Sequence, residues 1–196
     1  MNIRSDVVVV NQVKDGNENT LKYDENTHRV TWIDIDDKGL SKSRNLALRN
    51  SENSISVLAD DDLIYLDNTH EIIHKAFNQY DEAVIICFHV RGIERIFKNY
   101  SAKVKKLNFF SAMKVSSVEI AFRTRSIKNA NIKFDEDFGA GSKYIMGEEN
   151  IFLSQALKKG LKIYYVPEVI ADLHLGDSSW FQGYNELFFI SRGASF

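Results

Sequence analysis

The sequence lacks most features of secreted and membrane-spanning proteins. Its single cysteine, Cys87, excludes a disulfide within the chain and lies in the apolar run 83–88, where an inert buried thiol is expected. Such sparse cysteine use is typical of a reducing compartment. No apolar run approaches the ~20 residues of a membrane span, and the first ten residues lack the apolar stretch of a signal peptide. We therefore expect a cytoplasmic protein.

Net charge is also nearly absent. The 25 Lys and Arg residues almost balance the 27 Asp and Glu residues, which leaves a net charge of −2. No global basic field would recruit nucleic acid, so we expect no nucleic-acid partner. Apolar residues make up 44% of the 196 positions, which suits one globular domain spanning residues 1–196.

Three consecutive aspartates follow a short apolar run at residues 55–59, which has the length of a buried strand. Asp60, Asp61 and Asp62 would repel one another unless a divalent cation neutralised them. The alternative is a solvated acidic turn, which is the commoner setting for adjacent aspartates.

A helix is predicted just before this strand, with Ser41 as its N-cap. Lys42 and Arg44 then fall in its first turn, where cations oppose the helix dipole. Their presence is explained if this turn meets a phosphate, which the free N–H groups would also bind. Alternatively, both side chains extend into water.

These residues resemble two motifs of family 2 glycosyltransferases of the GT-A fold. Gly39-Leu40-Ser41 and Arg44-Asn45 are similar to its G-x-S/A-x-x-R-N helix, and Asp60-Asp61-Asp62 to its D-x-D strand end. The resemblance implies that Asp60 and Asp62 hold Mg²⁺ or Mn²⁺ on the diphosphate of a nucleotide-sugar. It further implies donor contacts from a set of polar residues: Ser41, Arg44, Asn45, Asp60 and Asp61.

The N-terminal part contains two predicted strands. The valine run 7–10 has no alternation, as in a parallel strand covered on both faces. Asn11 and Gln12 end it, where open α/β sheets place ligands, so both are candidate donor-binding residues. The polar stretch 14–28 is predicted to be a loop, and 29–35 a second strand. Because family members open with a further strand and helix, we expect an exposed sheet edge that could pair with a second copy of the chain.

The middle of the chain carries fewer signals. Asn68 and Glu71 are spaced as a capping box at the start of a helix. His70 and His74 lie one turn apart but lack a nearby third ligand, so exposed positions are favoured over a metal site. The basic segment 98–107 is either a surface turn or a contact for anionic lipid heads at a membrane.

The second half resembles the same family through F-D-E-x-F-G at residues 134–139 and a G-E-D-like element at 147–149. The family's catalytic base is the Asp of that element, and its place is taken here by Glu149, next to Glu148. The alternative is that both glutamates simply favour a helix N-terminus. Gly160 is expected to stop that helix, and Pro167 to end the strand 161–166. A late histidine, His174, is a candidate metal ligand by the same resemblance.

Together these observations predict an α/β protein with the GT-A three-layer sandwich and a mostly parallel central sheet. The resemblance implies transfer of a sugar, with inversion, from a nucleotide-diphosphate sugar such as a UDP-sugar. A glycan or lipid-linked acceptor in bacterial capsule or exopolysaccharide synthesis, at the inner face of the membrane, is the implied setting.

Two other functions fit parts of the sequence. A nucleotidyltransferase also uses carboxylate-bound Mg²⁺, but it would carry a Gly-rich signature with a basic residue near the N-terminus, which is missing from this sequence. The second is a non-catalytic domain that binds a nucleotide-sugar or a partner enzyme.

Overall fold

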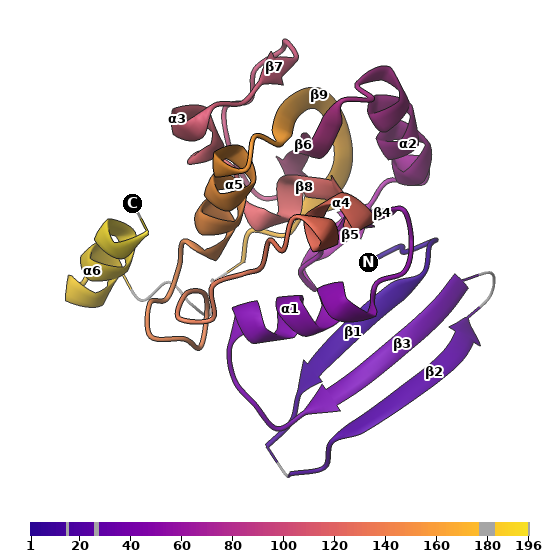
Figure 1. Ribbon diagram of the computed structural model, residues 1–196, viewed down its shortest axis with the longest axis vertical. Helices are drawn as coiled ribbons and strands as arrows, with labels where there is room; N and C mark the ends of the chain where they lie inside the picture. The colour runs from indigo at the N-terminus through magenta and orange to yellow at the C-terminus, as the bar shows by residue number, and fades with distance from the viewer. Residues whose placement is uncertain (15, 26–27, 177–182, 196) are drawn as a thin grey trace. The chain divides into compact units, whose positions relative to one another are not determined.

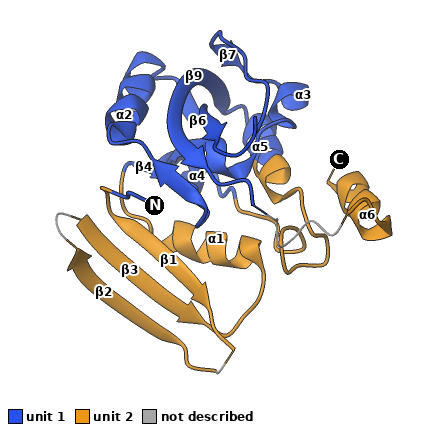
Figure 2. Ribbon diagram, turned by 180° about the vertical axis from the view of Figure 1, so that it is seen from behind, with its two compact units in different colours: residues 1–3, 54–132, 153–178 blue, residues 4–53, 133–152, 179–196 orange. Residues whose placement is uncertain are grey.

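A computed structural model describes residues 1–14, 16–25, 28–176 and 183–195 (Figure 1). The chain forms two compact units, coloured separately in Figure 2. Unit 1 comprises residues 1–3, 54–132 and 153–178, and unit 2 comprises residues 4–53, 133–152 and 179–196. Because each unit is assembled from interleaved stretches of sequence, no composition change along the chain marks a boundary between them.

Unit 2 is built on a three-stranded sheet with the order β1-β3-β2. Strand β1 (Val7–Gln12) pairs parallel with β3 (His28–Ile35), and β2 (Asn19–Glu25) pairs antiparallel with β3. Helix α1 (Leu40–Asn50) packs against β1. Among the described residues β1 pairs on one side only, and its valines are half-buried rather than covered on both faces.

Strand β2 corrects the prediction of a loop across residues 14–28. All seven of its residues are exposed. An edge strand with no buried face carries no apolar alternation, so its pairing with β3 leaves no hydrophobic pattern in the sequence.

Unit 1 contains a six-stranded mixed sheet. Its main path is β4-β8-β6-β9-β5, and β7 pairs with β9. The inner pair β6–β9 is parallel, while β4–β8, β6–β8, β5–β9 and β7–β9 are antiparallel. The strands are β4 (Ile55–Val57), β5 (Leu63–Tyr65), β6 (Ala83–Gly92), β7 (Lys105–Lys106), β8 (Ile120–Arg123) and β9 (Lys162–Leu173).

The remaining elements are helices. They are α2 (Thr69–Gln79), α3 (Phe109–Ala112), a 3₁₀ turn η1 (Ser117–Glu119), α4 (Thr124–Asn129), α5 (Glu148–Lys158) and α6 (Glu186–Ala194). Helix α5 begins in unit 2 and ends in unit 1. Gly160, with φ of 75°, follows α5 as predicted.

The predicted capping box at the start of α2 is wrong. Asn68 is the N-cap, but its side chain makes no capping hydrogen bond, and its φ and ψ of −103° and 15° are not those of an extended cap. The hydroxyl of Thr69 instead donates to the carbonyl oxygen of Ile170, which ties the start of α2 to β9.

Strand β9 also runs further than predicted. It continues past Pro167 to Leu173, and its register against β6 shifts between the pairs Cys87–Tyr165 and His89–Val169. Because proline has no N–H to donate, it is accommodated at such an irregularity. The sequence could not distinguish a bulge from a strand end.

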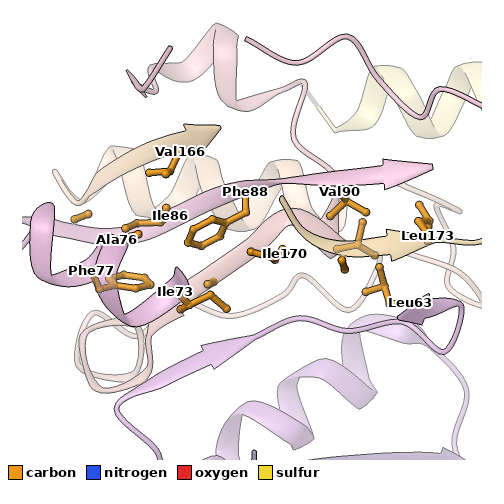
Figure 3. Close-up of a cluster of buried hydrophobic side chains, with 14 residues drawn as sticks. Leu63, Ile73, Ala76, Phe77, Ile86, Phe88, Val90, Val166, Ile170 and Leu173 are labelled. Atoms are coloured by element: carbon orange, nitrogen blue, oxygen red, sulfur yellow. The ribbon is translucent and has the colours of Figure 1, made fainter. Parts of the chain in front are cut away.

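Aromatic and aliphatic side chains fill the core of unit 1 (Figure 3). Ile73 and Phe77 from α2 meet Phe88 of β6 and Ile170 of β9, all at 5% exposure or less. Cys87 is fully buried, as predicted, and burial raises the pKa of its thiol well above the ordinary value. This core fixes the sheet whose strand ends carry the acidic residues described below.

Truncation of this core should be costly. We expect Phe88→Ala to lower the free energy of unfolding by about 3–5 kcal/mol, because it removes a fully buried ring and leaves a cavity. Urea denaturation followed by circular dichroism measures the loss. Phe110→Ala, at a ring that is 79% exposed, is the matched control and should change stability by no more than ~0.5 kcal/mol. Equal losses would place Phe88 outside the cooperative core.

Candidate functional site

One face of helix α1 in unit 2 is polar and yet buried. Ser41, Arg44 and Asn45 are only 0%, 8% and 4% exposed. Positions three and four apart share a helix face, so these side chains form one buried polar stripe. Buried polar groups need hydrogen-bond partners, and the partners identify what the stripe holds.

Ser41 and Asn45 bind the segment 134–139. The Ser41 hydroxyl donates to the carbonyl oxygen of Phe138 at 2.7 Å. Asn45 pairs with Phe134 in both directions, since its amide donates to the Phe134 carbonyl and its oxygen accepts from the Phe134 N–H, each at 2.9 Å. The Asn45 amide also donates to Glu136 at 2.9 Å. Two motifs almost a hundred residues apart in sequence are therefore joined directly.

Arg44 forms a buried ion pair with Glu148, the first residue of α5. Arg44 Nη1 lies 2.9 Å from Glu148 Oε1, and both side chains are 8% exposed. The guanidinium also lies over the ring of Phe134, 5.6 Å from its centre. Removing either partner from such a pair leaves an uncompensated buried charge, which is strongly destabilising.

The prediction that Ser41 caps α1 is wrong. The N-cap is Gly39, with φ of 126°, and the Leu40 N–H donates to the carbonyl of Ala140 at 2.9 Å. Ser41 lies two residues past this N-cap, and its hydroxyl donates to the Phe138 carbonyl. Gly139 has a φ of 102°, and a Cβ there would lie 3.3 Å from the Ser41 hydroxyl and 3.4 Å from the Glu148 carboxyl, so a side chain would be strained as well as crowded at this position.

The two cations in the first turns of α1 behave differently. Lys42 pairs with Asp37 at 2.8 Å, and this hydrogen bond raises the pKa of Lys42 and lowers that of Asp37. Arg44 is buried and does not extend into water as the alternative interpretation required. Donor contacts by Ser41, Arg44 and Asn45 stay a prediction, because these side chains contact the protein itself.

Polar side chains also gather at the carboxyl ends of the parallel strands β1 and β3. Asn11 donates to Asp34 at 2.8 Å, and the indole N–H of Trp32 donates to the same Asp34 oxygen at 2.8 Å. Gln12 donates to the hydroxyl of Ser43 in α1 at 2.9 Å. Asp34 was not among the predicted site residues, although it lies near the end of a predicted strand and pairs in register with Asn11. Open α/β sheets bind ligands at such strand ends.

The three aspartates lie in unit 1, in the turn between β4 and β5. The carbonyl of Asp62 accepts from the N–H of His174 at 3.1 Å, and Asp60 lies 3.5 Å from the hydroxyl of Ser117. Asp62 is exposed as a residue, but partial burial of its carboxyl raises its pKa, and the charges of Asp60 and Asp61 raise it further, against a smaller opposing effect of His174. This is a concentration of carboxylate charge that a cation would relieve.

Glu94, which was not among the predicted site residues, orients His174. His174 Nδ1 lies 2.9 Å from Glu94 Oε1, and the Leu175 N–H donates to the other Glu94 oxygen at 2.7 Å. The hydrogen bond with His174 is the largest cause that lowers the pKa of Glu94 to about 2. Metal-binding histidines commonly have one ring nitrogen fixed by a carboxylate in this way.

The predicted metal ligands are not gathered into a preformed cage. Within the residues that the structure describes, no group of three or more His, Cys, Asp or Glu side chains is placed to hold a metal ion. Asp60 and Asp62 nevertheless offer the oxygen ligands that Mg²⁺ and Mn²⁺ prefer. Mg²⁺ is commonly held by one or two carboxylates plus substrate phosphates and water, so these residues fit such an ion. His70 and His74 are exposed on α2.

The candidate base, Glu149, lies in the first turn of α5, next to Glu148. Glu148, Glu149 and Arg44 belong to unit 2, whereas Asp60, Asp62 and His174 belong to unit 1. The ion pair with Arg44 gives the Glu148 carboxylate a structural contact. Across the described ranges, no helix has the length and apolar character needed to cross a membrane.

Comparisons with known proteins show the fold. No family model matches the chain, and no curated protein sequence matches it. The structure is similar to Staphylococcus aureus TarS residues 1–349, with a TM-score of 0.67 and 15% identity over 86% of this chain and 51% of that one. It is also similar to TarS 1–349 in complex with UDP-GlcNAc, with a TM-score of 0.61 and 14% identity over 83% of this chain and 48% of that one.

The chain thus spans about half of the TarS structures that it matches. The predicted α/β class is confirmed, and the fold is similar to that of TarS. At 14–15% identity this similarity concerns the fold alone.

The buried ion pair generates a stability prediction. Arg44→Ala should lower the free energy of unfolding by about 3–5 kcal/mol, because the Glu148 carboxylate would remain buried without its counter-charge. The double variant Arg44→Met/Glu148→Met should lose much less than the sum of the two single variants, as measured by urea denaturation. Arg49→Ala, at an exposed position of the same helix, is the control. Additive losses would show that the two charges do not interact.

Proposed function

We propose that this chain is a metal-dependent inverting glycosyltransferase that moves a sugar from a nucleotide-diphosphate sugar to an acceptor hydroxyl. The observation that carries the proposal is the acidic turn Asp60–Asp62, held against the backbone of His174, in a chain with the fold of TarS. A TarS structure contains UDP-GlcNAc, which supports a UDP-sugar as the donor to test first.

In this proposal Asp60 and Asp62 hold the metal, and His174, whose backbone N–H donates to the Asp62 carbonyl and whose Nδ1 contacts Glu94, would join them as a further ligand when the ion binds. Bound Mg²⁺ or Mn²⁺ would offset the charge of the leaving diphosphate. Asp61, which is exposed, and the polar strand ends at Asn11 and Gln12 are proposed donor contacts.

Glu149 is the proposed general base. It would take the proton of the acceptor hydroxyl as that oxygen attacks the anomeric carbon, and the diphosphate leaves from the opposite face. Such an in-line displacement inverts the anomeric centre. Glu148 holds Arg44, and Arg44 thereby acts as a positioning residue for the start of α5. A growing glycan or lipid-linked sugar of a bacterial polysaccharide is the proposed acceptor.

A second candidate function is a non-catalytic domain that binds a nucleotide-sugar. The observation that favours it is the engagement of Arg44 by Glu148, because the cation expected at the phosphate is committed within the protein. Calorimetric binding of UDP together with no release of UDP from UDP-GlcNAc would support this candidate over the enzyme.

The metal assignment predicts that UDP binding is lost together with the Asp62 carboxylate. Asp62→Asn should abolish Mn²⁺-dependent UDP binding in calorimetry while leaving the urea midpoint nearly unchanged, because the side chain is exposed. Asp81→Asn, at another exposed aspartate of unit 1, is the control. Since the pKa of Asp62 is raised, protons should compete with Mn²⁺ above the pH at which an ordinary aspartate titrates. Affinity should therefore fall as the pH is lowered toward that raised pKa. Unchanged affinity in Asp62→Asn would remove the metal assignment.

Variants of the two glutamates should lose different properties, activity for Glu149 and stability for Glu148. Glu149→Gln should lower UDP release from UDP-GlcNAc by about 10²–10⁴-fold without weakening UDP binding, because a base acts on the acceptor proton. Glu149→Asp, which restores the family's usual residue, should also lose activity in an enzyme adapted to the longer side chain. Glu148→Gln should lower stability first, since Arg44 would remain charged and buried. Full turnover in Glu149→Gln, with loss in a stably folded Glu148→Gln, would make Glu148 the base.

A further inference from the structure

One segment of unit 1 concentrates positive charge that the rest of the chain does not share. Residues 103–114, KVKKLNFFSAMK, contain four lysines and no acidic residue, whereas the whole chain has a net charge of −2. We call residues 103–114 the basic–aromatic segment. All four of its lysines are exposed, namely Lys103, Lys105, Lys106 and Lys114.

The segment is anchored from the inside. Leu107, Ala112 and Val115 are 8%, 3% and 7% exposed and pack into unit 1. Strand β7 pairs with β9, and the Leu107 N–H donates to the Ile163 carbonyl at 2.8 Å. Asn108 and Ser111 form a capping box at the start of α3. Its outward side chains are therefore presented by a fixed backbone.

Aromatic rings project from the same segment. Phe110 is 79% exposed, while Phe109 and Val104 are each 38% exposed. The two rings meet edge to face with centres 6.4 Å apart. Figures 1 and 2 both place β7 and α3 at one extremity of unit 1. Single exposed apolar residues are ordinary, but adjoining aromatic rings among lysines mark an interaction surface.

The chemistry of the segment favours a lipid surface. Lysines beside exposed aromatic rings match anionic headgroups above an apolar layer, and each lysine near such a surface is worth about 1 kcal/mol. The segment has no arginine, the residue best suited to bidentate recognition of nucleic-acid phosphates. Glu82 lies near Lys106 but is already engaged by Lys162 and by the hydroxyl of Tyr164.

We propose that the basic–aromatic segment docks unit 1 on an anionic lipid bilayer, with Phe110 entering the headgroup region and the four lysines facing lipid phosphates. This interaction does not depend on whether the chain is an enzyme. It selects the lipid contact from the two interpretations that the sequence left open for the basic residues 98–107.

Vesicle sedimentation tests the proposal. The full chain should bind vesicles of phosphatidylcholine and phosphatidylglycerol, bind pure phosphatidylcholine far less, and be released by salt. Lys105→Glu/Lys106→Glu should weaken binding by about 25-fold or more, at roughly fivefold for each lysine removed. Phe110→Ser should weaken binding on the order of tenfold, because an exposed ring no longer enters the bilayer. Urea midpoints close to wild type would confirm that both variants fold.

Matched controls locate the surface. Lys75→Glu/Lys158→Glu makes the same charge change at exposed positions of unit 1 and should leave sedimentation nearly unchanged. Phe189→Ser removes a ring that is 62% exposed on α6 and should do the same. Loss in either control equal to that in the segment variants would overturn the assignment. If the lysines were needed for binding to single-stranded RNA, and Phe110→Ser left vesicle binding unchanged, the partner of the segment would be nucleic acid and not a lipid bilayer.

Discussion

The buried ion pair between Arg44 and Glu148 is the constraint on which the architecture of unit 2 depends. Two charges at 8% exposure are tolerated only if their geometry is kept, because either one alone would be a large desolvation cost. The pair joins the beginning of α1 to the beginning of α5, and Asn45 and Ser41 join the same helix to the loop that precedes α5. Fixed from three positions, this loop presents Glu149 on a defined helix turn.

This arrangement changes what the arginine-containing motif means. The resemblance implied that Arg44 meets a phosphate, whereas its guanidinium contacts a carboxylate of the protein and lies over Phe134. A cation in the early turns of α1, unfavourable for the helix dipole, is explained by this partner without any ligand. Glu148 therefore has a structural contact in this fold, and the proposed general base is its neighbour Glu149.

The sequence predicted elements whose pattern is set by burial and missed those set by pairing alone. The apolar run 83–88, recognised in the sequence as a buried stretch, lies in strand β6, and Gly160 marked the end of α5. Strand β2 was missed because it buries nothing. The cap at Gly39 and the bulge near Pro167 were also missed, since each depends on a distant segment, Ala140 in one case and β6 in the other. Glu94 had no detectable signal, because its partner His174 lies eighty residues away.

The acidic turn Asp60–Asp62 and the Glu148-Glu149 pair differ in the same way, in how much of their environment the sequence reveals. The aspartates at Asp60–Asp62 are adjacent in sequence, so their mutual repulsion could be inferred before the fold was known. The partner of Glu148, in contrast, is set by the packing of α1 and could not be inferred from the Glu148-Glu149 pair itself. A motif of adjacent charges thus predicts where a cation is needed, but only the folded contacts reveal whether the protein already supplies one. In unit 2 Arg44 supplies the cation for Glu148. At the acidic turn of unit 1, partial burial is the main cause that raises the pKa of Asp62, and the charges of Asp60 and Asp61 add to it against a smaller opposing effect of His174.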